Sequence, residues 1–150
     1  MNERARAENI LELVEAELMQ NLTELETIVD TRDEALESYI SAIGVFNETG
    51  SFPADFREPE LPQITSVAYQ LATQSGAILR VDPENLLVIA QAYEALNTVQ
   101  ANAEFLDNRN AQIRFQDGEQ YLSGFIYFTN RAIRDEPAAV EAVQSAIDVL

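Results

Sequence analysis

An apolar stripe runs through the first 46 residues of the chain and predicts one long amphipathic helix. Its members recur every three or four positions, the spacing that keeps side chains on one face of a helix. They are Leu11, Val14, Leu18, Leu22, Leu25, Val29, Leu36, Tyr39, Ile43 and Phe46. The helix is expected from about Arg4 to Phe46, which makes it roughly 60 Å long.

One position of this stripe is polar, and it raises the alternative of two helices. Arg32 interrupts the apolar series, and Thr31 and Glu34 have the spacing of a capping box, so a second helix could begin at Thr31. The stripe keeps its phase across Arg32, which favours a single continuous helix. A kink within residues 30–33 is the alternative.

The same stripe could also be the seam of a coiled-coil dimer. The step from Leu18 to Leu22 departs from a strict heptad, and further apolar residues make the stripe wider than a two-stranded seam. These residues are Ile10, Met19, Ile28 and Ile40. Packing inside the molecule is therefore favoured, and a homodimer through the long N-terminal helix stays open.

Turn-forming residues end the long helix. Residues 47–53 include Asn, Gly, Ser and Pro, and the loop is expected to reach Leu61, with Phe52 and Phe56 pinning it to the bundle. Pro62 suits the first turn of a second helix, which Gly76 would end. The apolar face of that helix is expected to comprise Ile64, Val67, Ala68, Leu71 and Ala72.

Three further helices are expected in the second half of the chain. The sequence Asp82-Pro83-Glu84 is typical of a helix start, and this helix would run to about Ile113, antiparallel to the long helix. An aromatic-rich helix follows over 121–133, and Asp135-Glu136-Pro137 is expected to end it and to cap a short last helix. The sequence thus predicts one all-α domain over 1–150, a bundle of about five helices in which the third and fourth flank the long first one.

The charge balance changes the choice of partners. The chain has 26 acidic residues and nine basic ones, all of which are arginine, so its net charge is −17. Nucleic-acid binding requires a basic surface, and anionic lipid also attracts basic segments, so the sequence predicts no nucleic-acid partner and no binding to a lipid surface. An acidic surface without lysine also fits adaptation to high salt, although genome base composition can remove lysine too.

Candidate chemistry is sparse. The chain has no His and no Cys, which excludes the usual zinc, iron and copper sites and catalysis by either residue. Two groups of carboxylates lie at helical spacing, and both are interpreted as solvated acidic faces rather than weak Ca²⁺ or Mg²⁺ sites. They are Glu8, Glu12 and Glu15, and Asp30, Asp33, Glu34 and Glu37. The sequence therefore predicts no catalytic, metal-binding or cofactor-binding residue.

Four short motifs, spread over the first two thirds of the chain, carry a resemblance. They are Asn2-Glu3-Arg4, Leu18-Met19-Gln20-Asn21-Leu22, the run from Tyr69 to Ala77, and Ala92-Tyr93. With them the chain resembles the soluble domain of a loose group of bacterial single-span membrane proteins of unknown function. The resemblance implies that a transmembrane helix precedes Asn2 and anchors the domain on the extracytoplasmic side of the membrane; a cytoplasmic protein is the alternative.

Three classes of function compete. The favoured class is a non-enzymatic interaction or scaffold domain with an unidentified protein partner, because a long rigid helix suits the presentation of a surface. The second is a helical sensor that binds a small ligand among Tyr69, Tyr93, Tyr121 and Phe125, since aromatic side chains often line pockets between helices. An enzyme comes third, because Asp, Glu, Ser, Tyr and Arg remain available.

Overall fold

The protein is an all-α bundle, as predicted. A computed structural model describes residues 2–112 and 117–150. Within these ranges there are five α-helices, one short 3₁₀-helix and no strand. The elements are α1 (Glu3–Val29), α2 (Arg32–Thr49), α3 (Val67–Ser75), the 3₁₀-helix η1 (Ala77–Arg80), α4 (Pro83–Gln112) and α5 (Gly118–Val149). None of these helices combines the length and apolar content needed to cross a bilayer.

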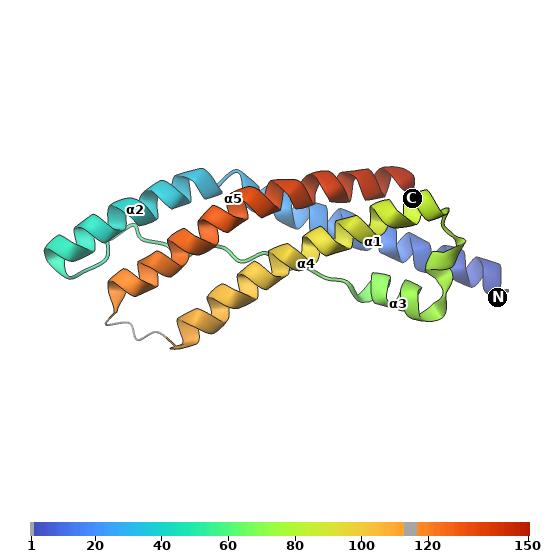
Figure 1. The fold of residues 1–150 in the computed structure, drawn as a ribbon, viewed down its shortest axis with the longest axis horizontal. Helices are drawn as coiled ribbons and strands as arrows, with labels where there is room; N and C mark the ends of the chain where they lie inside the picture. Colours follow the sequence, from blue (N-terminus) through green and yellow to red (C-terminus); the bar gives the residue numbers. More distant parts are fainter. Residues whose placement is uncertain (1, 113–116) are drawn as a thin grey trace.

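The helices form an elongated bundle built around α4 and α5 (Figure 1). These two helices lie side by side, while α1 packs on one half of α5 and α2 on the other half. The short elements α3 and η1 pack on α1. The prediction that the third helix would be the main partner of the N-terminal helix is wrong, because α4 pairs with α5 instead.

Two hydrophobic clusters divide the core. The first joins α1, α3 and η1 to the N-terminal half of α4 and the C-terminal half of α5, with Val14, Leu18, Leu25, Leu96 and Val143 among its fully buried members. The second joins α2 to the other halves of α4 and α5 and is rich in aromatic side chains, among them Tyr39, Tyr121, Phe125 and Phe128. The helices α4 and α5 are thus the elements shared by both clusters.

The expected continuous N-terminal helix is divided at Asp30 and Thr31. Both residues keep φ and ψ near the right-handed helical region, so the chain bends without unwinding. The carbonyl of Ile28 accepts hydrogen bonds from the backbone N–H of Thr31 at 3.1 Å and from its hydroxyl at 2.6 Å. A hydroxyl bonded back to the preceding turn bends a helix. Thr31 stands at the N-cap of α2, but its side chain makes no cap bond, so the capping box is not formed.

The predicted helix boundary at Asp135-Glu136-Pro137 is also wrong, because α5 continues through Pro137 to Val149. A proline inside a helix removes one backbone hydrogen bond and costs about 3 kcal/mol. Burial on both sides of the proline offsets that cost, since Phe125 and Ala132 on one side and Ala139 and Val143 on the other are almost fully buried. The predicted end of the third helix at Ile113 lies outside the described residues.

A long irregular segment connects α2 to α3 and runs back along the bundle (Figure 1). It begins at Gly50, whose φ of 71° suits glycine, and the predicted anchoring by Phe52 and Phe56 is confirmed. The Phe52 ring stacks on Phe56 at 4.8 Å, and Phe56 lies 5.8 Å from Phe125. The next helix starts at Val67 rather than at Pro62, and Gly76 ends it with a φ of 76°, as predicted.

Candidate functional site

A buried carboxylate holds the start of α3 against α1. Glu17 is 7% exposed, and its two carboxylate oxygens accept the backbone N–H groups of Ala68 at 2.8 Å and Tyr69 at 3.3 Å. These N–H groups belong to the first turn of α3, where the helix dipole favours a negative charge. The Tyr93 hydroxyl donates to the same carboxylate at 2.7 Å, and the Thr65 hydroxyl donates at 3.4 Å.

Two more polar side chains of α1 bind the segment that leads into α3. Asn21 is fully buried, and its amide bonds Thr65 twice: Nδ2 donates to the Thr65 carbonyl at 2.8 Å, and Oδ1 accepts the Thr65 N–H at 3.0 Å. The Glu24 carboxylate accepts the N–H of Gln63 at 3.1 Å. Glu17, Asn21 and Glu24 are four and three positions apart and therefore lie on one face of α1.

The outward face of α3 is apolar where the sequence predicted burial. Val67 is 72% exposed and Leu71 is 41% exposed, while Ala72 is fully buried. In the following 3₁₀-helix, Leu79 is 76% exposed. Ala68, Tyr69 and Ala72 form the inner face of α3, and the bonds to Glu17 fix its orientation. The prediction that Val67 and Leu71 belong to the buried face is therefore wrong.

This outward face also lacks negative charge. Residues 61–81 contain no Asp and no Glu, although acidic residues make up 26 of the 150 positions in the chain. The exposed polar neighbours of Val67 and Leu71 are the uncharged Gln70, Thr73 and Gln74. The exposed apolar residues Val67 and Leu71 of α3, together with Leu79 of the following η1, are called the α3 face below.

A cleft of about 410 Å³ adjoins the α3 face at the end of the bundle, between α1 and η1. Its walls include Ser75 of α3 and two exposed arginines, Arg6 of α1 and Arg80 of η1. Its apolar lining comes from Ala7, Ile10 and Ala77, and Glu3 is its one carboxylate. Its chemistry suits a ligand that has both a negative charge and an apolar part.

A second cleft of about 450 Å³ lies on the other side of Arg80 and collects acidic side chains of α1. Glu8, Glu12 and Glu15 line it together with Asp82. Within the ranges that the structure describes, no three acidic side chains are arranged to hold a metal ion. The second predicted acidic group, at the start of α2, is exposed on the surface.

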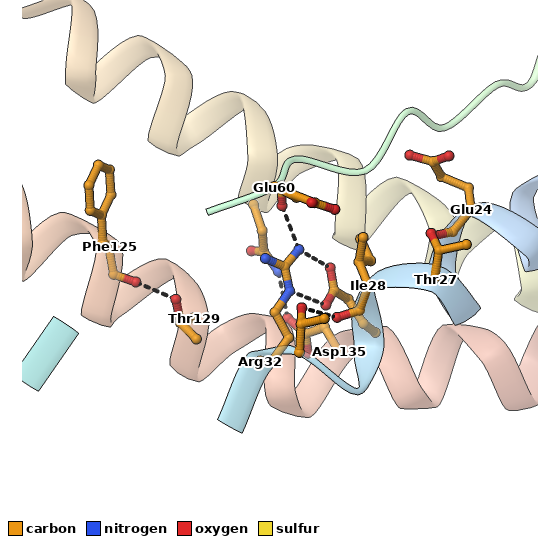
Figure 2. Close-up of polar contacts among 11 residues, drawn as sticks. Glu24, Thr27, Ile28, Arg32, Glu60, Phe125, Thr129 and Asp135 are labelled. Carbon is orange, nitrogen blue, oxygen red and sulfur yellow. Dashed lines mark hydrogen bonds and ion pairs between the residues drawn. The ribbon is translucent and has the colours of Figure 1, made fainter. Parts of the chain in front are cut away.

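A buried ion pair lies at the bend between α1 and α2 (Figure 2). The Arg32 guanidinium donates to both carboxylate oxygens of Glu136, at 2.8 and 2.9 Å, and to the carbonyl of Glu60 at 2.7 Å. Both charged side chains are about 2% exposed. The ring of Phe128 lies 5.1 Å from the guanidinium carbon. The pair therefore joins α2, α5 and the irregular segment at one buried point.

The four aromatic residues proposed for a sensor pocket do not meet. Tyr69 and Tyr93 stack at 4.0 Å in the first cluster, and Tyr121 and Phe125 pack edge to face at 4.5 Å in the second. Neither cleft above is lined by any of them, and neither is a third cleft of about 330 Å³ between α2 and residues 55–60. These four rings pack within the two hydrophobic clusters instead.

Burial also raises the pKa values of three tyrosines. The pKa of Tyr39 is raised to about 12 by burial, with Glu58 adding to the effect and Arg32 opposing it. Burial, and then the hydrogen bond to Glu17, raise the pKa of Tyr93 well above its ordinary value. Burial and a hydrogen bond to Glu58 raise the pKa of Tyr121. These hydroxyl groups are neutral donors at neutral pH.

Sequence reasoning missed Glu17, Asn21 and Glu24, although a signal for them was present. They follow each other at the same spacing as the apolar stripe, and a polar residue in phase with a buried stripe indicates a buried polar contact. Three of the four motifs that carry the resemblance meet here, since Asn21, Tyr69 and Tyr93 all lie close to Glu17 or its partners. Comparison of the chain with protein-family models, curated protein sequences and solved structures found no match in any of the three.

Proposed function

We propose that this chain is a non-enzymatic interaction domain that binds a protein partner through the α3 face. The observation that carries the proposal is the exposure of Val67, Leu71 and Leu79 within a stretch that has no acidic residue. Depletion of charge around exposed large apolar side chains is typical of the centre of a protein interface. The remaining surface, with its many carboxylates, favours solubility over contact.

The way α3 is held supports the same function. Glu17, Asn21 and Glu24 fix the backbone of residues 63–69 through hydrogen bonds, most of them partly buried. Binding to a helix that is already rigid costs less conformational entropy than binding to a segment that must become ordered first. The α3 face is thus presented ready-made.

A second copy of this chain is the alternative partner. The apolar stripe of α1 that would form a homodimer seam is buried inside the molecule at Val14, Leu18 and Leu25. On α1 the exposed large apolar side chains are Leu13 and Met19, each 53% exposed. They are six residues apart, so they point in directions that differ by about 120° around the helix axis. Because they form no continuous strip, we place the contact on the α3 face rather than on the N-terminal helix.

We also propose that the domain stands on the extracytoplasmic side of a bacterial membrane, anchored by a span that precedes Asn2. The resemblance to bacterial single-span membrane proteins supports this location. The test is the coding sequence upstream of Asn2 in the native gene, together with fractionation of native cells. A native start at Met1 and recovery of the protein in the cytosol would contradict the proposal.

The interaction itself is tested by photo-crosslinking in cells that make the protein natively. A photoreactive phenylalanine derivative replaces Leu71 in one variant and Leu13 in another, because Leu13 is similarly exposed but lies beside Glu12 on α1. The Leu71 variant is expected to give a discrete adduct that the Leu13 variant does not give. Equal adducts from both positions, or none from Leu71, would refute a docking site on α3.

A further inference from the structure

Two arginines stand apart from the others in their contacts. Eight arginines lie in the described ranges, and six of them have a carboxylate, a carbonyl or an aromatic ring as partner. Arg6 and Arg80 have no such partner among the described residues, and both line the cleft between α1 and η1. In a chain with 26 carboxylates, two free guanidinium groups in one cleft are a feature that the packing of the fold does not explain.

The cleft and the α3 face are continuous. Val67, Leu71 and Ser75 follow each other at four-residue intervals, so they form one line along the outer side of α3. Ser75 lines the cleft at the end of that line, and Leu79 precedes Arg80 in η1. A single extended or helical segment could therefore contact the apolar residues and the arginines together.

The two arginines of the cleft indicate that such a segment would carry a negative charge. Guanidinium groups bind carboxylates through paired, charge-assisted hydrogen bonds, and the cleft has one carboxylate of its own, Glu3, beside its two arginines. Arg80 also lines the second cleft, which Glu8, Glu12, Glu15 and Asp82 make acidic. Repulsion between these exposed carboxylates and an incoming one is screened over about 8 Å at physiological ionic strength. Arg6 and Arg80 are the positive groups that a carboxylate entering the first cleft would meet.

We propose that the cleft binds a carboxylate side chain of an acidic, aliphatic segment of the partner protein, while apolar side chains of the same segment pack on Val67 and Leu71. The inference rests on the proposed function, and it adds the chemistry of the partner. Arg6 and Arg80 supply the recognition of charge, and the α3 face supplies the apolar contact.

The test is selection from a displayed library of random peptides on the immobilised protein. The variants are Arg6→Gln with Arg80→Gln, and Val67→Ser with Leu71→Ser. Arg4→Gln is the control, since Arg4 is exposed, pairs with Glu8 and does not line the first cleft. Each variant is first checked by circular dichroism. The native chain and the control should enrich peptides that combine Asp or Glu with Leu, Ile or Val. A selected acidic peptide should bind the double arginine variant about tenfold more weakly, as expected for a lost hydrogen bond between charged groups.

The outcomes separate the two proposals. Apolar peptides without an acidic residue, or acidic peptides that bind the double arginine variant unchanged, would overturn this inference and leave the docking function intact. Enrichment no greater than that on the Val67 and Leu71 variant would overturn both. Self-association that disappears in the double arginine variant, measured by sedimentation, would assign the acidic segment to a second copy of this chain and overturn the choice of a foreign partner.

Discussion

Asn21 and Thr65, 44 positions apart, exchange two hydrogen bonds in the manner of two paired backbone strands. The Asn21 amide occupies both backbone groups of Thr65 at a place where no strand is available to do so. A buried backbone N–H or C=O without a partner is costly, so this one side chain stabilises the partly buried segment before α3.

Replacement of Asn21 by leucine should therefore destabilise the protein strongly. The change keeps the approximate shape but leaves the Thr65 N–H and carbonyl unpaired, and we expect a loss of about 2 to 4 kcal/mol in the free energy of unfolding. Urea unfolding followed by circular dichroism measures it. The matched control is Thr23→Ala, an exposed position on the same helix. A similar small loss in both variants would show that the paired bonds contribute little.

The Arg32–Glu136 pair should be sensitive to the loss of one partner and tolerant of the loss of both. Arg32→Met leaves the Glu136 carboxylate buried without its cation, and we expect a loss of about 3 to 5 kcal/mol. Combining Arg32→Met with Glu136→Leu should restore a large part of that loss, because no uncompensated charge remains. A double-mutant cycle from denaturant unfolding gives the coupling energy. Additive losses would contradict the buried pair.

Stability should fall in strongly alkaline solution. The pKa of Tyr39 rises from 10.0 to about 12 on folding, and the pKa values of Tyr93 and Tyr121 are raised in the same direction. Above pH 10 the unfolded chain releases these protons while the folded chain retains them, so deprotonation favours unfolding. The stabilisation is fully present below pH 10 and is lost as the pH rises through about 12.

Thermal unfolding between pH 8 and 12, with tyrosinate absorbance as the second signal, measures this dependence. Tyr127 is 45% exposed, so Tyr127→Phe is the matched control at a surface position. Tyr39→Phe should instead reduce the loss of stability at high pH. A native state whose melting temperature stays constant up to pH 12 would rule out the raised tyrosine pKa values.

Added salt should stabilise the protein. Like charges lie four positions apart on one helix at Glu8 and Glu12 and at Asp33 and Glu37, all exposed, and each such pair costs roughly a few tenths of a kcal/mol at low salt. Screening by NaCl weakens these repulsions, so the melting temperature should rise from low to moderate salt. Sucrose at matched osmolality is the control. A flat or falling melting temperature in NaCl would contradict the prediction.

Local sequence patterns were sufficient to predict an all-α fold but not to predict where each helix begins and ends. The stripe from Leu11 to Phe46 correctly predicted helix on both sides of Asp30. It did not reveal the buried ion pair at the bend, in which Arg32 binds Glu136, 104 positions away. No pattern near Arg32 reveals that partner. At Pro137 the local signal was strong but misleading, because burial of α5 on both sides of the proline outweighs the lost hydrogen bond.

The α3 face shows the same limit. Periodicity placed Val67 and Leu71 on the buried side of their helix, since both are large and apolar. The orientation of α3 is set instead by its bonds to Glu17, a residue of another helix about 50 positions earlier. Sequence spacing gives the relative angles of side chains around one helix, but only contacts with other elements decide which side of that helix faces water.

The sharing of both hydrophobic clusters by α4 and α5 has a consequence for how the chain folds during synthesis. The two helices are neighbours in sequence, so their contacts are local and can form quickly once both have been made. The helix α2 precedes them by many residues, and its main helical partner is α5. On the ribosome, the apolar side chains of α2 therefore stay exposed until nearly the whole chain has been made. A chaperone that covers exposed apolar surface would act during this interval.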